Sequence, residues 1–378
     1  MTSIGGAQMV DWNLAVATAT RLVRPGPDIS REEARAVVAE LRRHARASEE
    51  HVRLFTRMIP EGTEPEDTPV LVVDRAGWIK ANVAGFRELL RPLLAKMESR
   101  RSGGPGGAVL GAVGGKVTGV ELGMLLSFLA SRVLGQYETF APATRDLPAS
   151  ADGGGRLLLV APNIVHVERE LDVDPHDFRL WVALHEETHR TQFTGVPWLR
   201  DHLQGEIQTF LDETDVDPMT FLERLREAAQ SLSGAGRPEG EQGESDSRSL
   251  VDIVQTPAQR EVLGRLTAVM SLLEGHADFV MDAVGPEVVG SVSEIREKFQ
   301  QRRAQGAGRF DQALRKLLGL DAKLRQYKDG EKFVRSVVEE VGMDGFNRVW
   351  TSPNTLPTKA EIAKPADWVA RVHRKAES

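Results

Sequence analysis

The sequence predicts a mainly α-helical fold with one small β-sheet. Most of the 378 residues fall in stretches whose apolar side chains recur at a helical spacing, and Ser, Asp or Thr stands at the start of several of them. A single stretch, residues 157–165, is a continuous apolar run of strand length. We therefore expect helices along the whole chain, with a small sheet built around that run.

Residues 1–150 are expected to form an N-terminal helical region. A short helix is predicted over 11–23, and a second over 30–58 behind a capping box of Ser30 and Glu33. A third, over 75–97, contains Pro92, which should kink it near its end. Residues 60–69 are polar and contain proline, as is typical of a loop.

A glycine recurs at every fourth position within the apolar stretch 109–134. These glycines are Gly111, Gly115, Gly119 and Gly123. Small residues on one helix face let another backbone approach closely, so we expect core packing. A phosphate-binding loop is the alternative, but the stretch lacks G-K-[ST] and no strand precedes it. Charged residues interrupt the run, and we therefore do not expect a membrane span.

Residues 151–285 begin with the predicted strand, 157–165, in which Pro162 suits an edge or a strand end. A helix follows: Asp174 is a plausible N-cap and Pro175 occupies the first helical position. The body of this helix is mostly apolar, as expected for a buried element.

That helix carries the pattern H-E-x-x-H, formed by His185, Glu186 and His189. Four residues on a helix place the two imidazoles about 40° apart and about 6 Å along the axis. Both rings can then hold one Zn²⁺ while Glu186 serves as a base for water. The alternative is a chance match in which the two histidines form ordinary hydrogen bonds.

A catalytic zinc needs a third protein ligand. The metzincin continuation requires Gly at 192 and His at 195, where this chain has Gln192 and Gly195. A later helix, expected over 256–284, offers Glu274 and Asp278 on one face. We predict Glu274 as the third ligand and Asp278 as the acceptor that orients a ligand histidine.

His276 is the rival ligand, although it is rotated about 200° from Glu274 on a helix. Glu274 and Asp278 could instead merely solvate a helix end, but large apolar residues flank them on both sides. Residues 234–249 are polar and expected to form a mobile loop, and residues 286–378 to form a C-terminal helical region.

Composition limits the possible functions. The formal net charge of −7 argues against a nucleic-acid partner. The chain has no cysteine, so His, Asp and Glu must hold any metal. The N-terminus lacks a basic segment followed by an apolar one, so we expect no signal peptide and a cytoplasmic location. The oligomeric state cannot be read from this sequence.

The chain also resembles a known family, the zincin-like metallopeptidases widespread in actinobacteria. Six segments carry the resemblance: Val10 to Trp12, Asp74 to Trp78, Leu134 to Tyr137, His185 to Phe193, Leu273 to Asp282 and Leu317 to Tyr327. The H-E-x-x-H followed by E-x-x-x-D is similar to the gluzincin arrangement. The resemblance implies that the three regions form one integrated unit. It also implies a zincin-like helical core with the small sheet next to the metal site. Some members are labelled as associated with biosynthesis of a deazaflavin cofactor.

As a hydrolase, the protein would use zinc to activate water toward a peptide or small amide carbonyl, with Glu186 as general base. Candidate transition-state donors are Tyr137, Tyr327, His276, His166 and Arg190. One alternative is a non-catalytic, zinc-stabilised helical protein that binds a partner. A second is an accessory role in cofactor metabolism, which only the family label suggests.

Overall fold

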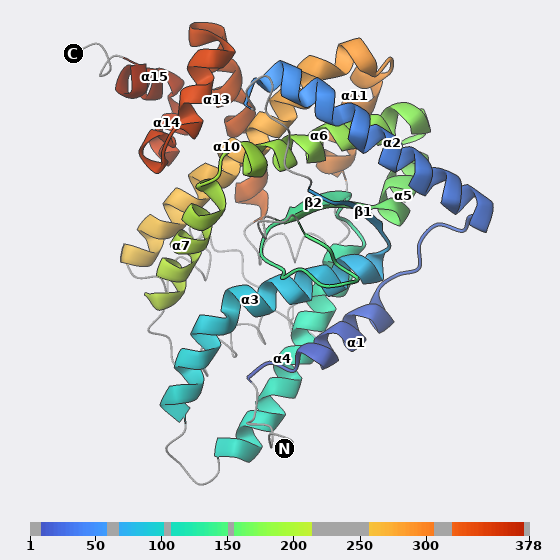
Figure 1. Ribbon diagram of the computed structural model, residues 1–378, viewed down its shortest axis with the longest axis vertical. Coiled ribbons are helices and arrows are strands. Elements are labelled where there is room, and N and C mark those ends of the chain that lie inside the picture. The colour runs from blue at the N-terminus through green and yellow to red at the C-terminus, as the bar shows by residue number, and fades with distance from the viewer. Residues whose placement is uncertain are drawn as a thin grey trace, which may run out of the picture.

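Helices surround a small three-stranded sheet in the computed structural model, which describes residues 9–58, 68–101, 107–149, 155–213, 257–305 and 320–373 (Figure 1). The predicted fold class, mainly α with a small sheet, is confirmed. The loop predicted at 234–249 lies outside the described residues.

The sheet has the strand order β1-β3-β2. Strand β3 (Arg156–Val160) is central; it runs parallel to β1 (Val70–Val73) and antiparallel to β2 (Gly135–Glu138). Leu159 belongs to the larger hydrophobic core, whereas Leu158 and Val160 belong to the smaller one on the opposite face. Burial on both faces explains why this strand is apolar throughout rather than alternating.

The strand predicted over 157–165 is therefore only partly right. It ends at Val160, and helix α5 (Ala161–Leu171) begins at the next residue. Pro162 lies in the first turn of α5 rather than at a strand edge. Backbone N–H groups in the first turn have no partner within the helix, so a proline there removes no helical hydrogen bond. The edge beside the candidate site belongs to β2, a four-residue strand that the apolar pattern does not reveal.

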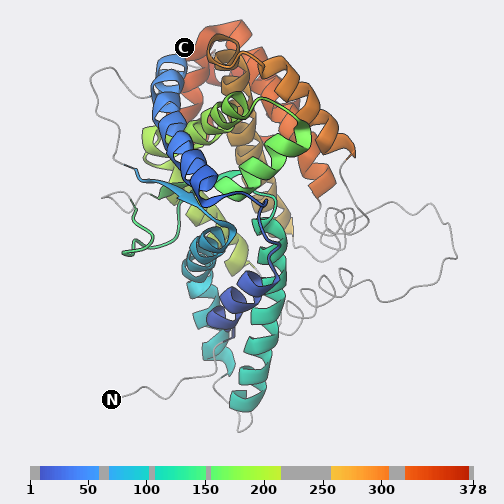
Figure 2. The same cartoon turned by 90° about the vertical axis from the view of Figure 1, so that its right-hand side faces the viewer.

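Helices α1 (Trp12–Leu22), α3 (Arg75–Arg101) and α4 (Gly107–Ala130) pack on one side of the sheet (Figures 1 and 2). A Cβ atom on Gly119 would lie 2.6 Å from the backbone oxygen of Asp11, and one on Gly123 would lie 2.8 Å from that of Ala15. The predicted close packing against another backbone is confirmed for Gly119 and Gly123, with α1 as the partner.

The other side of the sheet is covered by the larger helical layer. It contains α2 (Arg31–Thr56), α6 (Pro175–Gly195), α10 (Pro257–Val288) and α13 (Leu320–Phe346). Helix α6 contacts α2, α10 and the sheet, which makes it the central element of this layer (Figure 1). The Oδ1 atom of Asp174 accepts a hydrogen bond from the N–H of Asp177 at 2.9 Å, so the predicted N-cap is confirmed.

The other α-helices in the described ranges are α7 (Leu199–Asp212), α11 (Val292–Gln305), α14 (Lys359–Ala363) and α15 (Pro365–His373). Trp368 of α15 is fully buried, and its indole N–H donates to the carbonyl oxygen of Thr355 at 2.7 Å. This contact docks the C-terminal segment against the preceding turn. No helix in the described ranges combines the length and apolarity needed to cross a bilayer.

Candidate metal centre

Two histidines of α6 face the same space. The ring centroids of His185 and His189 are 4.9 Å apart, and the ring planes stand at 86°. Both side chains are mostly buried, because the apolar residues of α6 pack this helix against α2, α10 and the sheet. The spacing of four residues along a helix therefore brings two imidazoles together in a low-exposure position.

Glu274 on α10 completes a group of three. Its Oε2 lies 3.6 Å from Nε2 of His185, and its Oε1 lies 3.7 Å from Nε2 of His189. One ligand atom from each of the three residues lies within 4.8 Å of the others. Two imidazole nitrogens and a carboxylate oxygen at this separation can converge on one divalent cation.

A glycine beside Glu274 fixes the position of α10. A Cβ atom on Gly275 would lie 2.1 Å from the backbone of Gly330 on α13, so only glycine allows these two helices to approach this closely. The close contact holds the adjacent Glu274 against α6. Its position thus depends on a backbone contact more than 50 residues further along the chain (330 − 275 = 55).

Each histidine has an acceptor behind the ring nitrogen that faces away from Glu274. The Nδ1 atom of His185 lies 3.4 Å from Oδ1 of Asp278, and Nδ1 of His189 lies 3.0 Å from Oε1 of Gln192. Acceptors at these places favour the tautomer protonated on Nδ1, which leaves Nε2 with a free lone pair for a metal. Sequence reasoning considered Gln192 only as a departure from the metzincin pattern and missed this role.

The structure places His276 behind Gln192 and away from Glu274. The side-chain N–H groups of Gln192 contact the carbonyl oxygen of Leu273 at 2.9 Å and Nδ1 of His276 at 3.1 Å. The His276 ring is fully buried against Phe346 and Trp350, and burial lowers its pKa to about 3. His276 is therefore neutral and supports the amide that orients His189.

The electrostatics at His185 favour a positive charge, whereas burial lowers the pKa of His189 and keeps that ring neutral. Burial alone would lower the pKa of His185, but hydrogen bonds to Asp278 and Glu274 raise it to about 10. A proton and a metal cation compete for such a position. The residues present thus fit a zinc ion in both donor type and charge.

Glu186 is buried beside the first histidine. Burial raises the pKa of its carboxyl group to about 7, and the negative charge of Glu274 adds to the effect. Strand β2 begins against this side chain: a Cβ atom on Gly135 would lie 2.5 Å from Cδ of Glu186. Glycine at this position leaves room for the carboxylate. A carboxyl group whose pKa lies near neutrality is suited to take up and release a proton.

The other candidate donors lie in different settings. Tyr137 on β2 is buried and stacks on Phe193, with ring centroids 5.2 Å apart. Arg190 forms ion pairs with Glu187 at 2.8 Å and with Glu49 at 2.7 Å. His166 is exposed on α5, and the side chain of Tyr327 lies outside the described residues.

Known proteins show which family this chain resembles. A crystal structure from Chloroflexus aurantiacus, described as that of a candidate hydrolase with a novel fold, is similar to this chain at 31% identity and a TM-score of 0.66. The alignment covers 97% of this chain and 99% of that one. No curated protein matches. Residues 10–369, nearly the whole chain, match the family described as zincin-like metallopeptidases. The chain therefore belongs to the zincin-like metallopeptidase family.

Proposed function

We propose that this protein is a zinc-dependent peptidase or amidase. The observation that carries the proposal is the convergence of His185, His189 and Glu274 within 4.8 Å, beside the buried Glu186. A purely structural zinc site has no need of such a carboxylate. Membership of a metallopeptidase family supports the same reaction class.

The contacts of the residues support the following roles. His185, His189 and Glu274 hold the metal, while Asp278 and Gln192 keep the two rings oriented. Zinc in such a ligand set supplies Lewis acidity toward water and a carbonyl group. Glu186 takes the proton from the attacking water and delivers it to the leaving nitrogen, which its raised pKa allows near neutral pH.

The position of β2 supports an extended peptide as the substrate. In the described part of the chain β2 pairs with β3 alone, and its first residue, Gly135, touches Glu186. A peptide added along the outer edge of β2 would pass next to the catalytic base. A small amide, which cannot form such a strand, is the other substrate class that this chemistry accepts.

The test combines metal content with turnover. Zinc per chain is measured by plasma mass spectrometry for wild type and for His185→Ala, Glu274→Ala and His276→Ala. We expect the first two variants to lose about one zinc each relative to wild type, and the third to keep it. Wild type is then incubated with a peptide mixture, and the products are analysed by mass spectrometry. Zinc loss in His276→Ala but not in Glu274→Ala would refute the ligand set, and the absence of any cleavage or amide hydrolysis would refute the activity.

A further inference from the structure

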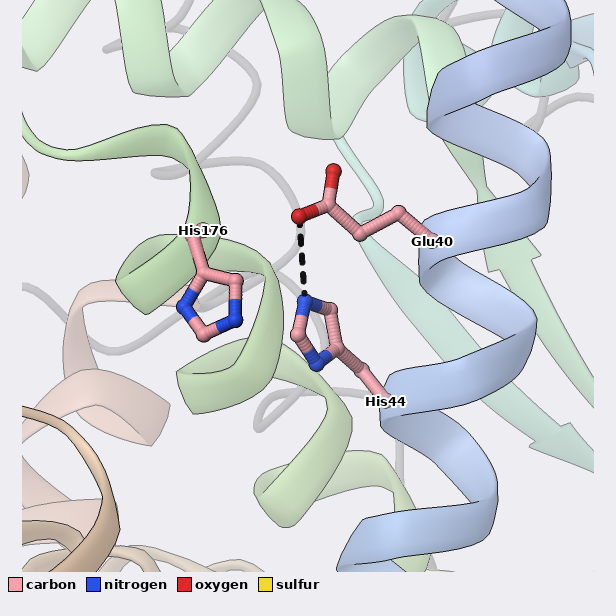
Figure 3. Close-up of side chains that lie close together, drawn as sticks. All are labelled: Glu40, His44 and His176. Atoms are coloured by element: carbon pink, nitrogen blue, oxygen red, sulfur yellow. Dashed lines mark ion pairs between the residues drawn. The ribbon is translucent and has the colours of Figure 1, made fainter.

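A second group of metal-ligating side chains lies where the first turn of α6 meets α2 (Figure 3). Glu40 and His44 are one turn apart on α2, and His176 is the second residue of α6. One ligand atom from each lies within 4.8 Å of the others. His176 precedes His185 by nine residues (185 − 176), about 13 Å along a helix axis, so this group is separate from the centre described above.

Among the three side chains, His44 gives the strongest indication that a metal ion binds here. Its side chain is only 8% exposed, and its Nε2 has no hydrogen-bond partner among the described residues. The nearest acceptor, Oε1 of Glu40, is 3.5 Å away, beyond the usual length of an N–H···O bond. A buried nitrogen without a partner costs free energy unless something binds it. Burial also lowers the pKa of His44, so the ring is neutral and its lone pair is available.

His176 faces the same point from the other helix. The ring centroids of His44 and His176 are 4.7 Å apart and the rings stand at 82°. Figure 3 shows one ring nitrogen of His176 directed toward His44. The Nδ1 atom of His176 lies 3.5 Å from Oδ1 of Asp177. This acceptor favours a proton on Nδ1 and leaves a free lone pair on Nε2. Asp278 stands behind His185 in the same way.

The third side chain, Glu40, is already oriented. One carboxylate oxygen contacts the guanidinium of Arg179, while the other faces His44. Arg179 also donates two hydrogen bonds to the buried carboxylate of Glu168, at 2.9 and 2.5 Å. Two carboxylates therefore share the charge of one arginine, which leaves Glu40 able to contribute negative charge to a cation.

A competing grouping of His176 with Asp174 and Asp177 is less suitable. Oδ1 of Asp174 accepts the capping hydrogen bond from the N–H of Asp177 at 2.9 Å. Oδ2 of Asp177 accepts from both the N–H and the hydroxyl of Ser291 at 2.8 Å. These carboxylate oxygens already accept hydrogen bonds at the start of α6, whereas the Nε2 atom of His44 has no hydrogen-bond partner among the described residues.

We propose that Glu40, His44 and His176 form a second zinc site that fastens α2 to the first turn of α6. Two imidazole nitrogens and one carboxylate suit zinc and the neighbouring divalent transition metals, and the exposed side of His176 admits water as a further ligand. The bound ion satisfies His44 and joins two helices that come from distant parts of the chain. This proposal does not depend on the peptidase activity of the other centre.

The test is zinc titration of the full-length chain with His185→Ala and Glu274→Ala, which removes two of the three ligands of the other centre. This parent is compared with the same chain carrying His176→Ala, and with a matched control carrying His166→Ala, an exposed histidine on α5. Calorimetry should show about one zinc bound by the parent and by the control. His176→Ala should weaken that binding at least about tenfold, and zinc should raise the Tm of the first two proteins only.

Equal zinc binding by the His176→Ala and His166→Ala chains would overturn the proposal. A second comparison needs no altered parent: wild type and the single variant His176→Ala are analysed for zinc per chain. Because the His176 side chain is 62% exposed, its replacement leaves the packing intact. The zinc content must fall by about one per chain, and an unchanged content overturns the proposal. A zinc content that falls in His185→Ala, measured as described above, but not in His176→Ala would support the other centre and refute this one.

Discussion

Both halves of helix α6 carry histidines, but the carboxylates near the two groups of histidines differ in how many hydrogen bonds and ion pairs they form with other residues. In the first turn, the carboxylates around His176 are held by Arg179, by Ser291 and by the capping hydrogen bond. In the second half, Glu274 lies 3.6 and 3.7 Å from His185 and His189. Glu186 is buried there, and its pKa is raised to about 7.

This difference distinguishes a structural metal site from a catalytic one. Carboxylates that are fixed by hydrogen bonds keep their charge and geometry, which suits a cation that joins two helices. A desolvated carboxylate such as Glu186 can change its protonation near neutral pH, which suits proton transfer. We therefore expect catalysis to depend on the second half of α6 alone, and the following predictions test that separation.

The largest effect is expected for Glu186→Gln. Removal of the general base should lower kcat/KM by about 10²- to 10⁴-fold while the zinc content stays the same. Peptide hydrolysis and metal analysis on one preparation measure both quantities. His176→Ala should keep wild-type turnover.

The matched control for this variant is Glu187→Gln. Burial raises the pKa of Glu187 to about 7 as well, but its carboxylate accepts a hydrogen bond from Arg190 at 2.8 Å. Its replacement should lower the Tm rather than turnover per zinc. Near wild-type hydrolysis by Glu186→Gln would show that this carboxylate is not the base.

The next largest effect is expected for Asp278→Asn. An amide can still accept a hydrogen bond from Nδ1 of His185, but it lacks the negative charge that favours the metal-bound ring. Zinc affinity at the centre should fall by about 10- to 100-fold, as measured by competition with a chromophoric chelator. Asp201→Asn, on the exposed face of α7, is the control. Equal affinities in the two variants would contradict the role given to Asp278.

Gly135→Ala should have a smaller effect that is confined to turnover. The new Cβ would lie 2.5 Å from Cδ of Glu186, so the carboxylate must move by a sizeable fraction of an ångström. We expect kcat/KM to fall about tenfold with zinc retained, because proton transfer depends on the position of the base. Gly264→Ala on α10 meets nothing within 4 Å and should leave kcat/KM unchanged. Unaltered turnover in Gly135→Ala would mean that β2 does not position the base.

The sequence predicts the helix that carries the candidate ligands because its signals are local. Asp174 and Pro175 start α6, and the spacing of His185 and His189 places them on one face. Strands β1 and β2 escape prediction because each has only four residues, and β2 reads Gly-Gln-Tyr-Glu without an apolar alternation. What makes them strands is pairing with β3, a non-local contact.

The same limit applies to the side chains around the metal centre. The tautomer of His189 depends on Gln192, which in turn contacts His276, 84 residues further on. His44 and His176 are 132 residues apart (176 − 44), and no motif spacing relates them. A single sequence contains periodicity and caps, but it does not show which distant helix faces will meet. The roles of Glu274, Asp278 and His276 stay predictions that the variants above can test.

The smallest effect concerns pH, and its sign follows from the state of Glu186. As a base this carboxylate acts only when deprotonated, so kcat/KM should fall as the pH decreases through its pKa. Burial raises that pKa to about 7, and the positive charge of a bound zinc lowers it from there. The acid limb should therefore lie below about pH 7, with a loss of less than about tenfold at pH 6. His176→Ala should give the same profile as wild type, since the other half of α6 contributes no proton. An acid limb above pH 7, or one that moves with His176→Ala, would show that the two halves of the helix are not separate in function.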